Sequence, residues 1–218
     1  MFKVERTGDA PVCLTSNEYN TPEVVERLYD IFHGKCYLCE QADLDAPEIE
    51  HFEPHMGDDT LKYDWENLYY SCARCNSIKG TRHRNLIDCC SSEINVVRAI
   101  KRKPPTMPDS NMEITAVIED PRVHNTVELL ERCFNEDNTA LRGITRANLS
   151  ENLFRHYTKL LSHRLVIVNR ESTDRDIQDA VERIEIMLRD TYEFSAFWRW
   201  CVMEDRQLRE KLGHALHF

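Results

Sequence analysis

Several features that define other protein classes are missing from this chain. No run of apolar residues approaches the roughly 18 needed to cross a membrane, and the first residues, MFKVERTGDAPV, contain no apolar signal region. These absences argue against an integral membrane protein and against a secreted one. The chain also has no GxxxxGK[ST] phosphate-binding loop, which excludes a P-loop ATPase, and it shows no internal repeat or low-complexity tract.

The chain also lacks an overall excess of basic residues, so its net charge alone does not predict binding to nucleic acid. Its net charge is −10 over 218 residues, but the charges are unevenly placed. Residues 74–103 carry eight Lys and Arg against two acids, whereas residues 41–66 carry nine acids and one lysine. Because local basic patches supply phosphate contacts, residues 74–103 are the predicted nucleic-acid contact. The acidic segment would repel a phosphate unless a cation intervened. The alternative for the run at 101–103 is a solvated loop.

The nine cysteines are an odd number, and four of them form the pairs Cys36-x2-Cys39 and Cys72-x2-Cys75, with 32 residues between the pairs. Two such pairs predict a zinc site with four thiolate ligands. Metal-binding pairs together with unpaired thiols favour a reducing compartment, so a cytoplasmic location is expected. The adjacent pair Cys89-Cys90 is an alternative source of a ligand, but neighbouring cysteines fit one site poorly. We interpret these two residues as structural thiols.

The predicted zinc clamp encloses an ordered set of polar residues. Glu50-His51-Phe52-x-Pro54 is followed by Asn67-Leu68 and then by Cys72-x2-Cys75-Asn76-x2-Lys79-Gly80. In this order and spacing, residues 36 to 84 resemble the HNH endonuclease family in its zinc-stapled form. The resemblance implies a ββα-metal fold, in which the histidine ends the first strand, the middle asparagine braces the loop and the last asparagine lies on the helix.

The resemblance implies roles that suit phosphodiester hydrolysis, which needs an activated water and neutralised negative charge. His51 is the expected base, because a neutral imidazole accepts a proton near pH 7. Glu50 and Asn76 are the expected ligands of a catalytic Mg²⁺ or another divalent ion, which prefers oxygen ligands. Asn67 completes the catalytic set in a mainly structural role. The expected contacts to substrate phosphates are Lys79, Arg82 and Arg84.

Each of these residues also has a simpler explanation. His51 and His55 lie four residues apart and are alternative zinc ligands, although the four cysteines already complete a tetrahedral set. Glu50 replaces the aspartate that is commoner in the family, so a solvated strand acid is the alternative to a metal ligand. Asn76 is also a suitable cap for a helix that begins at Ser77, and Lys79 has the alternative of an ordinary surface lysine.

The wider pattern predicts an α+β fold that is mainly α, in three regions. Residues 1–35 are a helical lead-in, with a helix start at Thr21-Pro22-Glu23 and a stop at Gly34. Residues 36–103 form the HNH module. Residues 104–218 follow a proline-rich break and carry apolar stripes at helical spacing, at 124–135, 149–165 and 177–202. These stripes, and the aromatic cluster at 194–200, are interpreted as core or as a partner surface, with base stacking as the alternative for the aromatics.

The layout of an HNH module followed by a helical region also resembles the HNH subunit of Septu antiphage defence systems and retron-associated HNH proteins. That resemblance implies a nuclease effector regulated by a separate ABC-type ATPase subunit, with residues 104–218 as the docking region. Nucleic acid, with DNA favoured and RNA possible, is the other expected partner, and no membrane is expected. The alternatives are a self-contained nuclease, an HNH-type ribonuclease, and a non-catalytic zinc module that binds nucleic acid or protein.

Overall fold

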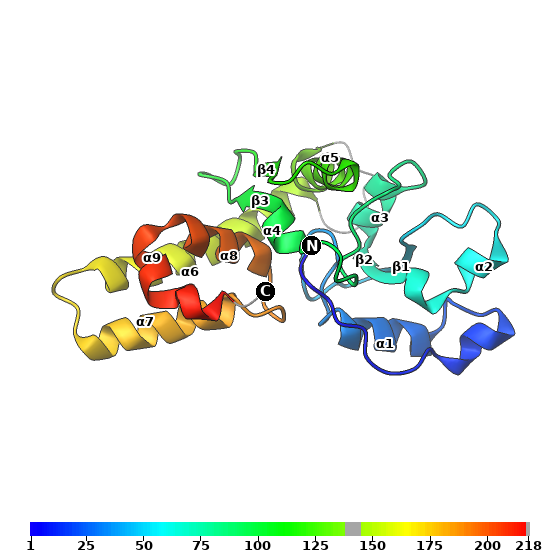
Figure 1. Cartoon of the computed structure of the whole chain (residues 1–218), viewed down its shortest axis with the longest axis horizontal. Helices are drawn as coiled ribbons and strands as arrows, with labels where there is room; N and C mark the ends of the chain where they lie inside the picture. Colours follow the sequence, from blue (N-terminus) through cyan, green and yellow to red (C-terminus); the bar gives the residue numbers. More distant parts are fainter. Residues whose placement is uncertain (138–144, 217–218) are drawn as a thin grey trace.

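The elements that carry the predicted site lie at one end of the molecule, and the C-terminal helices lie at the other (Figure 1). The computed structural model describes residues 1–137 and 145–216. Within these residues the fold is α+β and mainly α, as predicted, and it contains two antiparallel sheets of two strands each. Every described helix is too short or too polar to cross a bilayer.

The predicted nuclease module consists of a hairpin and one helix. Strand β1 (Pro47–His51) pairs with β2 (Leu68–Cys72), so that Pro47 faces Cys72 and His51 faces Leu68. Helix α3 (Ala73–Lys79) follows β2 without a loop, and the Cys72 thiol accepts a hydrogen bond from the Cys75 N–H at its start. The connection between the strands carries a short helix α2 (Asp59–Lys62) and the turn η2 (Trp65–Asn67).

Helix α1 (Pro22–Ile31) follows the turn η1 (Val12–Ser16) and packs against the hairpin. Thr21 accepts a hydrogen bond from the Val24 N–H, which confirms the predicted helix start. Gly34 has a φ of +66° shortly after the helix, and a Cβ there would lie 2.7 Å from the Tyr29 ring. Only glycine fits this close approach without strain, so the predicted stop at Gly34 has a clear physical cause.

The remaining elements form the middle and the far end of the molecule. They are α4 (Val96–Ala99), β3 (Ile100–Lys103), β4 (Glu113–Ala116), α5 (Pro121–Asn135), α6 (Arg146–Val168), α7 (Asp174–Met187), α8 (Ser195–Glu204), α9 (Arg206–Leu212) and η3 (Gly213–Ala215). Helix α5 packs on α3, α8 packs on β3, and α6 packs against α7. Helix α5 begins three residues before the expected stripe because Asp120 caps it and Pro121 opens its first turn.

The division predicted at residue 103 falls inside a hairpin. Strand β3 ends at Lys103 and pairs with β4, with Ile100 opposite Ala116 and Lys103 opposite Glu113. A continuous cluster of buried apolar side chains also runs from the cysteines of the module to Trp198 and Leu208. The regions predicted as 36–103 and 104–218 therefore share one sheet and one core.

A buried carboxylate adds a polar link between these regions. Glu40 follows the first cysteine pair and lies 3.1 Å from the Met1 ammonium, 3.9 Å from Lys35 Nζ and 3.6 Å from Arg102 Nη1. Met1 and Arg102 lie at Glu40 Oε1, whereas Oε2, the oxygen nearer Lys35, accepts a hydrogen bond from the Ser195 hydroxyl at the start of α8. Burial alone would raise the pKa of Glu40, but the three cations hold it at about 2. A single ionised side chain therefore ties the cysteine loop to β3 and α8.

The aromatic cluster lies in the core, as the simpler interpretation predicted. Phe194, Phe197 and Trp198 are fully buried. Trp200 is half-buried and donates a hydrogen bond from Nε1 to the Val97 carbonyl at 2.8 Å. The three buried rings therefore cannot stack on bases.

Candidate active site and metal centres

The four predicted zinc ligands lie together. Cys36, Cys39, Cys72 and Cys75 are buried, and their sulfurs all lie within 4.8 Å of one another. The Cys39 and Cys72 sulfurs are 3.9 Å apart. A zinc ion with four sulfurs at about 2.3 Å in a tetrahedron separates those sulfurs by about 3.8 Å, so the donor set and the spacing both fit zinc. A metal in this cluster would hold the start of α3 against the loop before β1.

A second group of three side chains in the described residues has metal-ligand chemistry but is already engaged. The ligand atoms of Asp88, Cys89 and Cys90 lie within 4.8 Å of one another. One Asp88 oxygen accepts hydrogen bonds from the Tyr69 hydroxyl at 2.5 Å and from the Cys90 N–H at 2.7 Å. These bonds give Asp88 a role in shaping this turn, in agreement with the structural interpretation of the two cysteines.

His51 ends β1 and is held as a neutral imidazole. Its Nε2 lies 3.0 Å from the Lys62 carbonyl oxygen, which can only accept, so Nε2 carries the proton and Nδ1 has the free lone pair. Burial lowers the pKa of His51, and the neighbouring His55 lowers it further, while the bond to Lys62 opposes the shift. The ring is therefore in the form that can accept a proton at neutral pH.

Two aromatic neighbours of His51 were not anticipated as site residues. The ring of Tyr19 meets His51 edge-on with centroids 4.9 Å apart, and the ring of His55 lies 4.8 Å away. Tyr19 comes from the segment before α1, and no sequence pattern links it to the site. The spacing of His51 and His55 was visible, but it suggested shared zinc ligation, which the four-cysteine cluster does not require.

Glu50 and Lys79 form a buried ion pair beneath His51. Lys79 Nζ lies 2.6 Å from Glu50 Oε1 and donates to the His51 carbonyl at 2.8 Å. Burial raises the pKa of Glu50 to about 7, although Lys79 opposes the rise. The prediction that Lys79 contacts a substrate phosphate is therefore corrected: its ammonium is buried and holds one oxygen of Glu50, which leaves Oε2 for another partner.

A second hydrogen bond between β1 and α3 lies two residues earlier on the strand, at Glu48. Glu48 and Glu50 share a face of β1 because side chains alternate along a strand. Asn76 Nδ2 donates a hydrogen bond to Glu48 Oε2 at 2.6 Å. Asn76 thus lies on α3 as expected, and its side chain bonds to Glu48. Sequence reasoning overlooked Glu48, although its position two residues before Glu50 placed both acids on one face.

Asn67 holds together the connection between β1 and β2, as the predicted structural role requires. Its Nδ2 donates to the carbonyls of Glu53 and Leu61, both at 2.9 Å, and its Oδ1 accepts from the Glu53 N–H at 2.7 Å. Its own carbonyl accepts from the Phe52 N–H at 2.9 Å. These bonds fix Leu61 and so place the next carbonyl, that of Lys62, which orients His51.

The basic segment 74–103 does not form a continuous surface. Arg74 is buried and donates to the Cys133 and Glu136 carbonyls, and Arg102 belongs to the Glu40 cluster. Lys101 pairs with Glu204, and Lys103 pairs with Glu113. The prediction of one patch over 74–103 is therefore wrong in its extent, because most of these charges have partners in distant elements.

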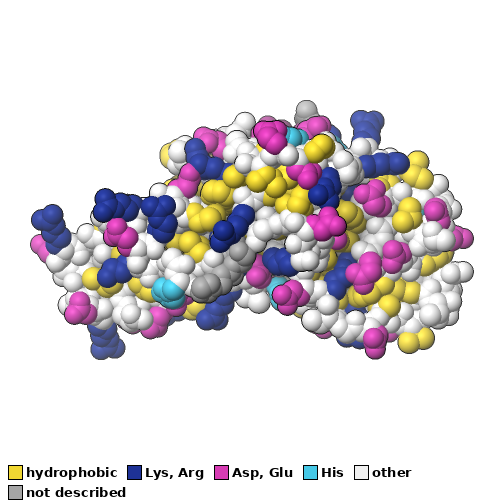
Figure 2. All heavy atoms as spheres, in the orientation of Figure 1, with side chains coloured by type: hydrophobic (Ala, Val, Ile, Leu, Met, Phe, Trp, Pro, Cys, Tyr) yellow, Lys and Arg dark blue, Asp and Glu magenta, His cyan; other side chains and the backbone are white. Residues whose placement is uncertain are grey.

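Arg82 and Arg84 are exposed directly after α3, next to the module. In the view of Figure 2, Lys and Arg side chains are scattered among acidic ones across the molecule. Arg82 and Arg84 therefore remain the predicted contacts to the phosphates of a nucleic acid.

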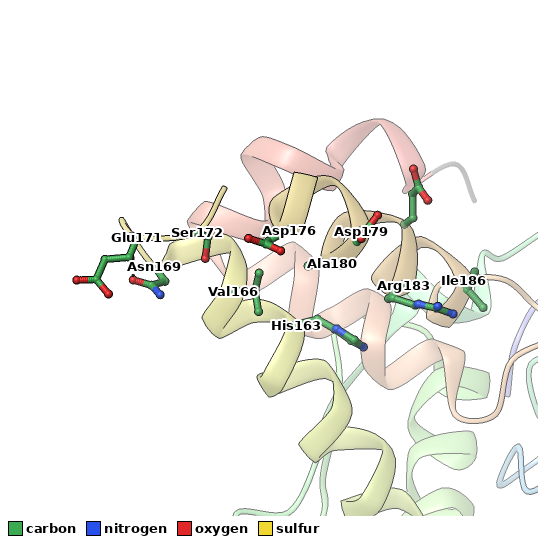
Figure 3. Close-up of a pocket in the computed structure, with 11 residues that line it drawn as sticks. His163, Val166, Asn169, Glu171, Ser172, Asp176, Asp179, Ala180, Arg183 and Ile186 are labelled. Atoms are coloured by element: carbon green, nitrogen blue, oxygen red, sulfur yellow. Dashed lines mark hydrogen bonds between the residues drawn. The ribbon is translucent and has the colours of Figure 1, made fainter. Parts of the chain in front are cut away.

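A groove of about 850 Å³ lies away from this chemistry, between the end of α6 and helix α7 (Figure 3). It is lined by polar and charged side chains around Val166, Ala180 and Ile186, and none of the predicted site residues borders it. A phosphodiester backbone does not require an enclosed cavity, so the separation of this groove from His51 does not conflict with a nuclease site.

Comparison with known proteins supports the family resemblance. Residues 36–82 match the model of the HNH endonuclease family. A stretch of 66 residues is 36% identical to the Septu protein PtuB of Bacillus thuringiensis, over 29% of this chain and 26% of that protein. The chain thus matches about a quarter of the length of that relative. The resemblance to HNH endonucleases is confirmed for the segment that holds the cysteine cluster and His51.

Proposed function

We propose that this protein is a metal-dependent HNH endonuclease that hydrolyses phosphodiester bonds in nucleic acid, with DNA as the favoured substrate. The observation that carries the proposal is the state of His51: a neutral imidazole whose Nε2 is held by a backbone carbonyl, at the end of the strand that carries Glu50 and bonds to Asn76 on α3, in a ββα module with a four-cysteine cluster. The family match over residues 36–82 supports the same class of reaction.

In the proposed mechanism, His51 Nδ1 accepts the proton of the attacking water. The bond from Nε2 to the Lys62 carbonyl fixes the ring and stabilises the imidazolium that forms. Asn67 holds the neighbouring Leu61 carbonyl and so keeps this acceptor in place. The catalytic role of Asn67 in this proposal is therefore indirect, through the orientation of the base.

The donor set beside His51 fits a hard divalent cation. Glu50 offers the carboxylate oxygen that Lys79 leaves free, and Asn76 offers its amide oxygen, both of the kind that Mg²⁺ prefers. When bound there, Mg²⁺ or another divalent ion would supply positive charge to the phosphate and the leaving oxygen. Lys79 acts in this proposal as a positioning residue for Glu50.

The substrate is tested by cleavage with the zinc-loaded protein in Mg²⁺. Plasmid, single-stranded DNA and RNA of equal length would be compared at several protein concentrations. We expect strand breaks in DNA. Cleavage restricted to RNA would support the ribonuclease alternative, and binding without cleavage of any substrate would support a non-catalytic zinc module.

Neutralising Arg82 and Arg84 together to glutamine is expected to weaken DNA binding and flatten its salt dependence. Each phosphate of B-DNA that the protein no longer neutralises should reduce the slope of log K against log[salt] by about 0.9, so the slope of the double variant should fall by about 1 to 2. Filter binding at several salt concentrations measures this slope. The matched control replaces Arg170 and Arg175, two exposed arginines at the far end of the molecule. Equal slopes for the two double variants would remove Arg82 and Arg84 from the interface.

The Septu resemblance supports a further part of the proposal: the chain acts as the nuclease effector of an antiphage defence complex, regulated by an ABC-type ATPase subunit. The candidate docking residues are the exposed apolar side chains Leu161 and Leu165 on α6 and Ile186 on α7, which are 38%, 63% and 38% exposed. Ile186 also borders the groove of Figure 3. Leu161 borders a separate groove that is also lined by Cys201 and Leu208. Exposed apolar side chains of this kind suit an interface in which a few large side chains contribute most of the affinity.

Replacing Leu165 and Ile186 by arginine is expected to lower the affinity for the proposed ABC-type ATPase subunit by about tenfold or more. Point variants are preferred to truncation at residue 103, which would separate β3 from β4. The control replaces Val117 and Ile118, which are 51% and 42% exposed near β4. Equal co-purification of both pairs would refute docking at α6 and α7. Full cleavage by the isolated chain at physiological salt would favour a self-contained nuclease.

A further inference from the structure

We infer that Glu48 is a positioning residue that turns the amide oxygen of Asn76 toward the catalytic metal. The inference rests on the proposed function, because it assumes that Asn76 is a metal ligand. It assigns a role to a residue that lies outside the catalytic set of Glu50, His51, Asn67 and Asn76.

The geometry pairs each candidate ligand with one partner across β1 and α3. Glu48 and Glu50 lie on one face of the strand, and Asn76 and Lys79 lie three residues apart on the helix, where side chains point the same way. The inner contact joins Glu50 to Lys79 at 2.6 Å, and the outer contact joins Glu48 to Asn76 at 2.6 Å. Each contact therefore joins one candidate ligand to one side chain of the facing element.

The chemistry of the outer contact fixes which atom of Asn76 is available. An ionised carboxylate can only accept hydrogen bonds, so the Asn76 atom that faces Glu48 must be the amide nitrogen. The amide oxygen is then the atom left for a cation. Without an acceptor at position 48, the amide could rotate by 180° and present its NH₂ group, which repels a cation. Glu48 thus orients the side chain of Asn76, as Lys79 orients the carboxylate of Glu50.

The pair of Glu50 and Lys79 and the pair of Glu48 and Asn76 differ in solvent exposure. Glu50 and Lys79 are buried, so replacing either one would leave its partner buried and unpaired where α3 packs on β1. Glu48 is exposed, and Asn76 is only partly buried. Replacing Glu48 should therefore leave the fold and the zinc cluster intact, which makes its effect on metal binding measurable in a folded protein.

The test compares Glu48→Ala with Glu48→Gln in the zinc-loaded, full-length protein. Both substitutions remove the same charge, but glutamine retains an oxygen that accepts from Asn76 Nδ2 and alanine does not. The readout is Mn²⁺ affinity, measured by titration calorimetry and by electron paramagnetic resonance. We expect Glu48→Ala to bind Mn²⁺ about 10- to 100-fold more weakly than Glu48→Gln, the range found when an orienting partner is removed. Glu48→Gln should lose only the attraction of one carboxylate, about 5- to 10-fold for a unit charge a few ångströms from a divalent ion in water at physiological salt.

Two reference variants make each outcome decisive. Asp45→Ala removes another exposed carboxylate three residues earlier and reports any general effect of charge. Asn76→Ala removes the proposed ligand itself. Equal losses for Glu48→Ala and Glu48→Gln would overturn the orienting role and indicate a role for the charge. Unchanged affinity in Glu48→Ala, with weaker binding in Asn76→Ala, would overturn this inference alone. Unchanged affinity in Asn76→Ala would contradict the proposed metal site.

Discussion

Replacing His51 by alanine is expected to lower the cleavage rate by about 10²- to 10⁴-fold, the range that a general base contributes. Zinc content and the thermal unfolding midpoint should stay close to those of the unmodified protein. The reason is that His51 lies at the end of β1, outside the cysteine cluster, and contacts the loop through one ring nitrogen. Single-turnover cleavage with excess protein measures the chemical step directly.

The matched control for this prediction is His124→Ala. His124 is an exposed histidine on α5 that contacts Glu119, so its loss removes an imidazole at a distance from the site. The control should cleave at the normal rate. Near-normal turnover by the His51 variant, in a preparation free of contaminating nuclease, would show that another group acts as the base.

Replacing Cys72 by serine is expected to abolish stoichiometric zinc binding and to unfold the ββα module. Cys72 ends β2, caps α3 and lies 3.9 Å from the Cys39 sulfur, so three parts of the module depend on it. Structural zinc sites contribute about 10 to 16 kcal/mol of apparent binding free energy in small zinc domains, which is comparable with the whole stability of a domain. Elemental analysis and circular dichroism measure the two effects.

Cys13→Ser provides the control for the loss of a thiol. Cys13 is half-buried, contacts the Thr21 hydroxyl and lies outside the cysteine cluster. This variant should keep one zinc per chain and unfold near the normal temperature. A Cys72 variant that retained zinc at full occupancy and normal stability would show that the four cysteines do not form one metal site.

The local features of the module were predictable because their causes are local. Two CxxC pairs restrict where four sulfurs can meet, and Cys36, Cys39, Cys72 and Cys75 meet as expected. The start of α1 at Thr21 also follows from residues within one turn. The confirmed predictions thus concern ligand spacing and capping residues, which act over a few positions.

The interactions of individual charged side chains were not predictable, because their partners come from distant parts of the chain. Lys79 was expected at a phosphate but is buried against Glu50, 29 residues earlier. Arg102 was expected in a basic patch but lies beside Glu40, which also bonds to Ser195. Composition reveals the sign of a charge, whereas its use depends on which acid the fold brings near it. The same reason explains why Glu48 was overlooked, since its partner Asn76 lies on another element.

The boundary at residue 103 shows a related limit. The proline-rich stretch 104–111 predicts a break between regions, and it does interrupt regular structure between β3 and β4. Strands β3 and β4 nevertheless pair with each other on either side of this stretch, because Ile100 and Ile114 are both buried in the common core. A break in local structure does not reveal whether the two flanking segments pair with each other.

In the proposed enzyme, two different metals serve two different sites, a buried zinc in the cysteine cluster and an exchangeable divalent ion beside His51. The most direct measurement follows DNA cleavage and zinc content together while EDTA removes exchangeable metal and Mg²⁺ is then restored. We predict that cleavage falls to background in EDTA with one zinc still bound per chain, and that it returns when Mg²⁺ is added in excess. Cleavage that continued at full rate in excess EDTA, with the zinc still bound, would contradict a second, catalytic metal.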